Sequence, residues 1–403
     1  MRRIMNLIFI SVDSLRFDRV GCLVNKSDTK TPNIDALGKN GVRFLNNFTV
    51  SNGSLPSHTS IFTGLYPQHH DIRENGLKVP SHLATIGSIL KSNGYATSAF
   101  VSSVLLDSIY GLNIGFDAYY NTSRFNKIHH LLSKIGYKKY NVSKALVHFN
   151  IHDGRSRSCD SVNKDVLSWL DNNASTRFFM FIHYMDIHRD TAGGTKTIRE
   201  KHKFYDDNVR LADAAIGEVM QSLKQKNLFN DTLIVVFSDH GETLSDGKGH
   251  GNSVSNDEFH TPLIMHLPGQ SATGITALTR TIDIMPTALG MLGLKIPSSI
   301  DGISLPLDGQ SGAQECFMES YPPYGDIKAV LTHQWKYVLS DGKNEQLFDR
   351  IHDVDEKNNV AHTEKDEAIK LKTKLKQHFN IPFTQQELDD VTKERLRGLG
   401  YLD

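Results

Sequence analysis

Residues that could perform chemistry are concentrated in the segment SLPSH, residues 54–58. Pro56 suits the first turn of a helix, where its missing N–H group has no intrahelical role. The spacing predicts a short helix ending near Gly64, with Ser54 at an N-terminus that favours anions. Ser54 could be a nucleophile, and His58, four residues later, would share its helix face as a catalytic partner. Alternatively, Ser54 only caps the helix and His58 is a surface residue.

Carboxylate and imidazole groups occur where two buried strands are expected to end. Asp13 ends the apolar run 6–13, and Asp239 and His240 lie in the run 232–241. Carboxylates combined with imidazole suit a divalent cation, and a serine oxygen can complete such a site. The cation would lower the pKa of the serine and neutralise the attacked ester. Taken singly, each residue could equally be a turn or cap residue.

A third expected strand, residues 177–186, contains His183 and Asp186 at its end, with His188 just beyond. These side chains could protonate a leaving group, bind substrate or hold a second metal. They could also form an ordinary polar loop. His250 lies in the glycine-rich stretch GKGHGN, which could fold back over the same site.

The elements that must position these residues alternate along the chain. Apolar runs predict strands at 6–13, 95–103, 177–186, 232–241 and 261–269, and helical patterns occur at 31–41, 83–94, 163–173 and 205–227. This alternation predicts an α/β fold with a large, mainly parallel central sheet flanked by helices. Such sheets place their chemistry at the carboxyl ends of strands, where the candidate residues fall.

Two regions depart from the alternating pattern. Residues 121–157 are rich in basic residues and histidine, and they belong to a predicted insertion, 104–160. This insertion is either a solvent-exposed helical segment or a positively charged surface that contacts an anionic substrate. Residues 328–349 predict antiparallel hairpins joined at Asp341-Gly342, and 364–379 an exposed helix. We therefore expect a catalytic domain over 1–310 and a smaller subdomain of antiparallel sheet and helix over 311–403.

Composition restricts the partners. Acidic and basic residues balance at 45 each, so no global field favours nucleic acid or an anionic membrane. The three cysteines are too few and scattered for a disulfide scaffold, which indicates a reducing compartment. The first apolar run is short and ends in Asp13, so it predicts a strand, not a signal peptide, and no run reaches the ~20 residues of a membrane helix. We expect a cytoplasmic protein without membrane insertion; the sequence does not define its oligomeric state.

Several blocks, in order along the chain, resemble the sulfatase family of the alkaline phosphatase superfamily. They are IFISVDSLRFDRVGC, TPNIDALGKNGVRFLNNF, SLPSHTSIFTGLYP, IHYMDIH, SDHGE, HTPLIMHLPG and QLFDRIHDVDEKNNVA. The resemblance implies an alkaline phosphatase-like fold and metal-dependent hydrolysis of a sulfate ester, carried on a small molecule or a glycan.

The resemblance also implies roles for individual residues. The expected metal ligands are Asp13, Ser54, Asp239 and His240, and Ser54 is also the expected nucleophile. The resemblance implies that His188 and His250 contact the sulfate or the leaving oxygen. It also implies that Lys78 binds substrate. The residue pattern alone adds His183 and Asp186 as substrate-binding candidates.

The nucleophile segment departs from the best-known sulfatases. In those proteins Cys or Ser is followed by x-Pro-Ser-Arg and is oxidised to formylglycine, whereas here His58 occupies the arginine position. The modifying enzymes generally read that arginine, which argues against conversion of Ser54. Ser14 stands where a second aspartate is usual, and His240 where an asparagine is usual. The cation could be Mn²⁺, Zn²⁺, Ca²⁺ or Mg²⁺, with the imidazole favouring Mn²⁺ or Zn²⁺.

Three hypotheses of function follow. The first is a metal-dependent sulfate ester hydrolase in which Ser54 attacks sulfur, or phosphorus, in line. The second keeps the fold and metal but is a phosphodiesterase or phosphoryl-group transferase with an unmodified Ser54. The third is a non-catalytic, sulfatase-like binding protein. Metal content and product analysis distinguish them.

Overall fold

The protein is described by a computed structural model that covers residues 5–25, 27, 29–121, 151–152, 156–188, 197–244, 250–307, 311–320, 325–381, 388 and 390–399. Most of the predicted insertion, residues 122–150 and 153–155, lies outside the described residues. The chain forms two compact units that interleave along the sequence. The first comprises 1–43, 81–238 and 263–272, and the second comprises 44–80, 239–262 and 273–403. The expected division at residue 310 stays a prediction.

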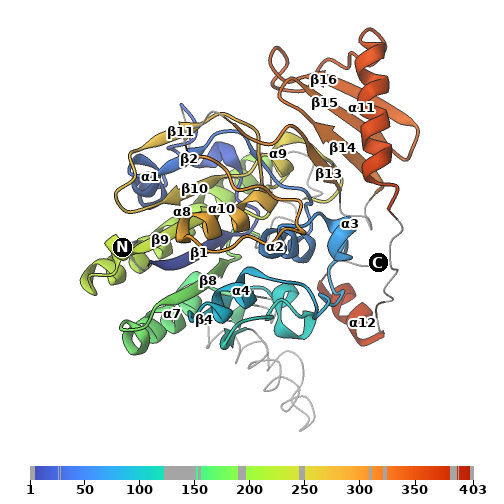
Figure 1. Ribbon diagram of the computed structural model, residues 1–403. Helices are drawn as coiled ribbons and strands as arrows, with labels where there is room; N and C mark the ends of the chain where they lie inside the picture. The colour runs from blue at the N-terminus through green and yellow to red at the C-terminus, as the bar shows by residue number, and fades with distance from the viewer. Residues whose placement is uncertain are drawn as a thin grey trace. The chain divides into compact units, whose positions relative to one another are not determined.

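A mainly parallel sheet forms the centre of the first unit (Figure 1). Its strands within this unit are β1 (Asn6–Val12), β2 (Val42–Phe44), β4 (Ala96–Val101), β5 (Ala118–Tyr120), β8 (Phe178–Tyr184), β9 (Thr232–Phe237) and β10 (Leu263–His266), in the order β2-β10-β9-β1-β8-β4-β5. β1 pairs in parallel with β8 and β9, whereas β10 runs antiparallel to β9. Every residue of β1, β8 and β9 is buried, which explains their unbroken apolar runs.

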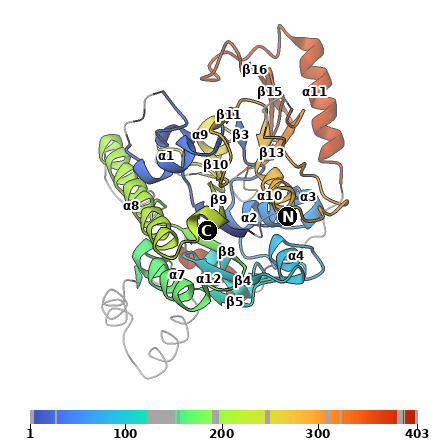
Figure 2. The same cartoon turned by 60° about the vertical axis from the view of Figure 1, so that its left-hand side comes forward.

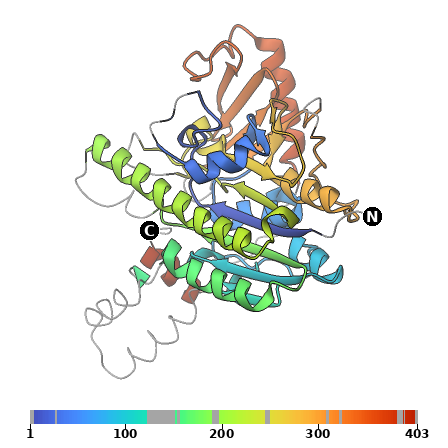
Figure 3. The same cartoon turned by 90° about the vertical axis from the view of Figure 1, so that its left-hand side faces the viewer.

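Helices cover this sheet. They are α1 (Pro32–Lys39), α4 (Ile86–Ser92), α7 (Cys159–Asn173) and α8 (Ile198–Gln225). Figures 2 and 3 show α8 as a long helix with α7 beside it. α8 begins earlier than the apolar pattern suggested because Thr197 and Glu200 form a capping box. α7 also begins earlier, because Ser158 caps it by accepting a hydrogen bond from the Ser161 N–H at 3.2 Å.

Short elements complete the first unit. They are the 3₁₀ turns η1 (Phe17–Arg19), η2 (Val104–Leu106), η3 (Ser108–Tyr110) and η4 (Phe229–Asp231), and the strands β6 (Ile151–His152) and β7 (Ser156–Arg157). The expected strands and helices of this unit are confirmed, and the α/β class with them. None of the helices that the structure describes combines the length and apolarity needed to cross a membrane.

The second unit contains the segment around Ser54. Its elements before residue 310 are β3 (Asn47–Phe48), α2 (Ser54–Thr63), α3 (Pro67–His70), α9 (Asn256–Phe259), β11 (Thr273–Ile275), β12 (Thr279–Arg280), η5 (Thr281–Asp283) and α10 (Ile284–Leu292). β3 pairs in parallel with β12, and α2 packs against η5 and α10. These neighbours bury α2 completely.

The same unit ends in an antiparallel sheet with one helix packed on it (Figure 1). The elements are β13 (Cys316–Glu319), β14 (Ile327–Leu331), β15 (Trp335–Ser340), β16 (Asn344–Asp349), α11 (Lys365–His378) and α12 (Asp390–Leu399). The β15–β16 loop, residues 341–343, holds Asp341 at φ 51° and Gly342 at φ 66°, both in the left-handed region that Asp and Gly tolerate in turns. The predicted hairpin and the predicted helix are both confirmed.

Candidate active site

Ser54 is the first residue of α2, and Gly53 precedes it as N-cap. The first turn is fixed from outside the helix, because the Leu55 N–H donates to Asn75 Oδ1 at 2.9 Å. The helix ends at Gly64, whose φ of 69° is the left-handed conformation that glycine adopts without strain. The sequence therefore predicted both ends of this helix, with Ser54 buried at its N-terminus.

His58 contacts the start of its own helix. Its Nδ1 lies 2.7 Å from the backbone oxygen of Ser54 and 3.6 Å from Asp239 Oδ2. A carbonyl oxygen can only accept, so Nδ1 carries the proton and donates to Ser54. The ring, fully buried, is positioned to hold the Asp239 carboxylate as well. A direct catalytic role for His58 stays a prediction.

Asp239 and His240 form a compact, fully buried pair in the second unit. The backbone oxygen of Asp239 accepts the Ser57 hydroxyl at 2.8 Å, which ties the pair to α2. His240 Nδ1 lies 2.8 Å from the Gly241 oxygen and must therefore donate to it. This leaves Nε2, 3.5 Å from Asp239 Oδ2, as the nitrogen available to a cation.

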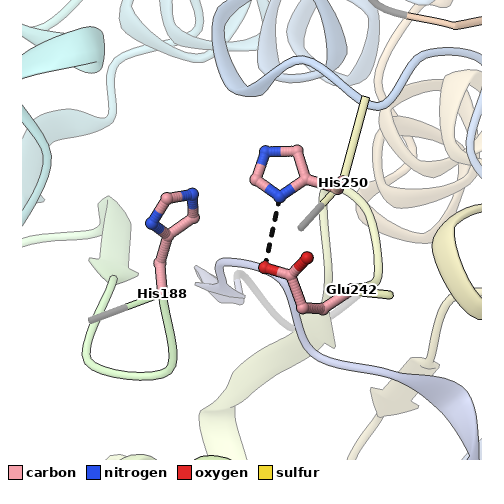
Figure 4. A group of neighbouring side chains, drawn as sticks. All are labelled: His188, Glu242 and His250. Atoms are coloured by element: carbon pink, nitrogen blue, oxygen red, sulfur yellow. Dashed lines mark hydrogen bonds and ion pairs between the residues drawn. The ribbon is translucent and has the colours of Figure 1, made fainter. Parts of the chain in front are cut away.

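Glu242 and His250 form a second pair, which is drawn in Figure 4. His250 Nδ1 lies 3.2 Å from Glu242 Oε2, and the His250 ring centroid lies 4.1 Å from that of His240. Each of the two pairs belongs to a group of side chains that could hold a metal ion. Glu242 was not among the site residues predicted from the sequence. Its position two residues after His240 could have indicated it.

Glycine is required between these pairs. A Cβ atom on Gly241 would lie 2.0 Å from the Asp257 oxygen. The backbone here pairs closely with α9, since the Gly241 N–H donates to the Glu258 oxygen at 2.7 Å. Any side chain at residue 241 would push His240 and Glu242 away from α9.

The buried carboxylate of Glu258 holds several segments around these residues together. Oε2 accepts from Asn52 Nδ2 at 2.6 Å and from the Gly251 N–H at 2.9 Å. Oε1 accepts from the Thr243 hydroxyl at 2.8 Å and from the Ser253 hydroxyl at 2.6 Å. One side chain thus fixes the residues before α2, after Glu242 and after His250. The sequence offered no signal for this role.

In the first unit, Asp13 follows β1 and faces the end of β8. Asp13 Oδ2 lies 3.3 Å from His183 Nε2, and both side chains are fully buried. The backbone continues through Ser14, whose φ of 61° is left-handed, and Ser14 Oγ donates to Asp13 Oδ1 at 3.0 Å. The end of β1 therefore presents a carboxylate whose rotamer is held by two neighbours.

Tyr205 of α8 fixes the unusual turn after Asp13. Its hydroxyl donates to the Ser14 oxygen at 2.6 Å and accepts from the Arg16 N–H at 2.8 Å. The ring is fully buried, so water cannot replace these bonds. This contact is not predictable from the sequence, in which Tyr205 is one position of the helical pattern 205–227.

The other candidates lie in different surroundings. Asp186 Oδ2 accepts from the Cys159 N–H at 2.9 Å, so it is bonded to the first turn of α7. His188 is partly buried on the segment after β8 (Figure 4), and Lys78 is exposed between α3 and α4. Their predicted roles in substrate binding stay predictions. Residues 245–249 of the predicted glycine-rich loop lie outside the described residues.

A mainly parallel sheet with acidic and histidine side chains at its strand ends is an arrangement typical of metal-assisted α/β hydrolases. The family model for sulfatases matches residues 5–294, and that for the C-terminal part of N-sulphoglucosamine sulphohydrolase matches residues 252–381. The chain belongs to the sulfatase family, within the alkaline phosphatase superfamily.

Known proteins similar to this chain agree with the family. Arylsulfatase K of Canis lupus familiaris is 22% identical over 97% of this chain and 85% of its own. The crystal structure of Ps i-CgsB in complex with k-i-k-neocarrahexaose has a TM-score of 0.79 at 22% identity, covering 98% of this chain and 97% of its own. The phosphonate monoester hydrolase SpPMH from Silicibacter pomeroyi has a TM-score of 0.75 at 22% identity, covering 94% and 96%.

Family membership confirms the expected class of reaction. The chain is a sulfuric ester hydrolase, and sulfatases generally depend on a divalent cation.

Proposed function

We propose that the chain hydrolyses sulfate esters of saccharides by direct attack of an unmodified Ser54 hydroxyl, with one divalent cation held by Asp13, Asp239 and His240. The observation that carries this proposal is the buried arrangement of Ser54, His58 and Asp239 in one unit. His58 Nδ1 lies 2.7 Å from the backbone oxygen of Ser54 and 3.6 Å from Asp239 Oδ2. The start of α2 is thereby linked to the proposed ligand.

The donor set fits a cation. Asp239 Oδ2 and His240 Nε2 lie 3.5 Å apart in a fully buried pair, and the His240 tautomer leaves Nε2 for coordination. Carboxylate oxygen with imidazole nitrogen suits Mn²⁺ or Zn²⁺ better than Ca²⁺. When bound, the cation would supply Lewis-acid stabilisation of the ester oxygens and lower the pKa of the serine hydroxyl.

Strand register supports Asp13 as the third ligand. β1 and β9 pair so that Ser11 lies opposite Phe237. Ser238, the residue after Phe237, donates to the Val12 oxygen at 2.8 Å and accepts from the Leu15 N–H at 2.9 Å. The residue after Val12 and the residue after Ser238 are both aspartates, Asp13 and Asp239.

The histidines supply the remaining functions. His58, with its proton on Nδ1, orients the backbone of Ser54 and holds Asp239. His250, orientated by Glu242 at 3.2 Å, is the group that we assign to protonating the leaving alkoxide. Water then releases sulfate from Ser54, which divides one difficult displacement into two easier ones.

A saccharide substrate is supported by one similar structure, that of Ps i-CgsB in complex with k-i-k-neocarrahexaose. A second candidate activity is phosphonate or phosphodiester hydrolysis with the same Ser54. It is favoured by the replacement of the usual arginine by His58 and by the similar fold of SpPMH.

The test uses the full chain loaded with Mn²⁺ and two small substrates, 4-nitrophenyl sulfate and a 4-nitrophenyl phosphonate monoester. We expect Ser54→Ala to keep its metal, measured by elemental analysis, and to lose at least about a thousandfold in turnover. The matched control is Ser60→Ala in the same helix, which removes the 2.8 Å bond between Ser60 Oγ and His70 Nε2 but no proposed catalytic group.

Full turnover by Ser54→Ala would refute the mechanism, and wild-type protein without metal or turnover would support the non-catalytic hypothesis. The ratio of the two substrates decides between sulfate and phosphonate chemistry.

A further inference from the structure

A pocket in the C-terminal sheet and helix shares no residue with the proposed active site. It has a volume of about 500 Å³ and lies between the end of α11 and the strands β14 and β15. A pocket of this size accommodates a ligand of about one or two sugar rings. All of its lining residues belong to the second unit.

One wall is formed by α11 and the residues just after it. Thr373, Lys376 and Gln377 line the pocket, at the i, i+3, i+4 spacing that places side chains on one side of a helix, and Asn380 lines it after the helix has ended at His378. This wall thus combines a hydroxyl, an ammonium and two amides. Hydroxyl and amide groups match the donors and acceptors of sugar hydroxyls.

Phe379, at the end of α11, adds an aromatic ring, and Lys328 of β14 adds a second cation. Lys328 Nζ lies 5.4 Å from the centroid of the Phe379 ring, within cation–π range, and 2.7 Å from Asp326 Oδ1. Phe379 is only partly buried, and it packs against the hydrophobic cluster beneath α11. An apolar ring surface anchored in this way can pack against the C–H face of a sugar ring.

The charge of the pocket is positive. Its ionisable lining groups are Lys328, Lys376 and Asp326, and Asp326 is paired with Lys328. Other lysines of α11 are neutralised nearby, since Lys372 pairs with Glu345 and Lys374 with Glu315. Among the residues that the structure describes, Lys376 forms no ion pair, so its charge is available to a ligand.

We infer that this pocket is an accessory binding site for an anionic saccharide, in which Lys328 and Lys376 bind a sulfate or carboxylate group and Phe379 packs on the sugar ring. The inference does not depend on the proposed reaction, because the pocket uses none of its residues. An accessory site of this kind would hold a charged polysaccharide on the protein while the active site acts elsewhere on it.

The test is calorimetric titration of the full chain with sucrose octasulfate, with sucrose as the uncharged probe. We expect the octasulfate to bind, with an affinity that falls as salt is raised, and sucrose not to bind. Lys376→Gln and Gln377→Glu change exposed groups on the helix face, and we expect each to weaken binding at least fivefold. The matched control is Lys370→Gln, on the same helix, where Lys370 pairs with Glu367 at 3.1 Å and does not line the pocket.

The controls make each result decisive. An unchanged affinity for Lys370→Gln, and unchanged hydrolysis of 4-nitrophenyl sulfate by all three variants, would support a pocket separate from the active site. Equal affinity of wild type, Lys376→Gln and Gln377→Glu would overturn the inference. It would also be overturned if Lys370→Gln weakened binding as much as Lys376→Gln, or if sucrose bound as well as its octasulfate.

Discussion

The imidazole of His58 donates from Nδ1 to the backbone oxygen of Ser54 across 2.7 Å, within one turn of a fully buried helix. The side chain that replaces the usual arginine is therefore bonded to the residue that sulfatases convert to formylglycine. The His58 ring is fully buried, and its Nδ1 proton forms that hydrogen bond. This arrangement places an imidazole where the best-known sulfatases have a guanidinium.

We predict that Ser54 remains a serine. Mass spectrometry of the peptide containing Ser54 should give the unmodified mass, even from a host that carries the modifying enzyme, because the arginine that such enzymes generally read is absent. A sulfatase with the Ser-x-Pro-Ser-Arg or Cys-x-Pro-Ser-Arg sequence, expressed in the same host, is the positive control. A peptide lighter by two hydrogen atoms and reactive towards hydrazides would contradict the prediction.

Glu258 should position the active site without touching substrate. In Glu258→Gln, an amide NH₂ replaces one carboxylate oxygen and cannot accept hydrogen bonds, so bonds from Asn52 and Gly251, or from Thr243 and Ser253, are lost. We expect a loss of about 2–4 kcal/mol in the free energy of unfolding, measured with urea. Turnover should fall more than tenfold while the KM changes little.

The control for Glu258 is Glu356→Gln, which weakens the pairing with buried Lys336, 2.8 Å away, in the C-terminal sheet. That variant should lose stability but keep the turnover number. If Glu258→Gln lost only stability, as this control does, Glu258 would have no positioning role.

Tyr205 should influence metal affinity through the backbone. Tyr205→Phe leaves the Ser14 oxygen and the Arg16 N–H without their 2.6 Å and 2.8 Å partners in a buried turn. Because Ser14 is held at φ 61°, we expect the turn to relax and Asp13 to shift. The Mn²⁺ dissociation constant, measured by calorimetry on the metal-free protein, should rise about tenfold, as for other outer-shell residues.

Tyr337→Phe is the matched control for Tyr205, because the buried Tyr337 bonds Glu345 at 2.9 Å in the other sheet. It should leave Mn²⁺ affinity unchanged. Equal Mn²⁺ affinity for wild type and Tyr205→Phe would show that the turn is held by its other contacts.

The sequence was most informative where local chemistry decides structure. Continuous apolar runs predicted β1, β8 and β9, because strands buried on both faces need apolar side chains at every position. The position of Pro56 and Gly64 predicted the bounds of α2. The antiparallel direction of β10 could not be predicted, since a buried run carries no mark of direction.

Positioning residues were not predictable from the sequence for a different reason. Glu258 and Tyr205 act through contacts with residues far away in the chain, such as Asn52 and Ser14, and these contacts exist only after folding. A buried glutamate in a polar stretch and a tyrosine in a helix have ordinary sequence neighbours. The candidate ligands were easier to identify because each of them lies within three residues of the end of a recognisable strand.

The stability of the protein should depend on pH through His378, whose ring stacks on Phe317 at 3.9 Å. Burial lowers the pKa of His378 from its ordinary value of 6.5 to about 4. Below pH 6.5 the unfolded chain takes up a proton that the folded chain does not accept until about pH 4, so stability falls as the pH drops through this window. In His378→Phe the aromatic stack is kept, and we expect roughly 1–3 kcal/mol less loss of unfolding free energy between pH 7 and pH 4, measured with urea. The exposed His362→Phe is the control and should lose stability as the wild type does; if His378→Phe did the same, the buried ring would not be the group that titrates.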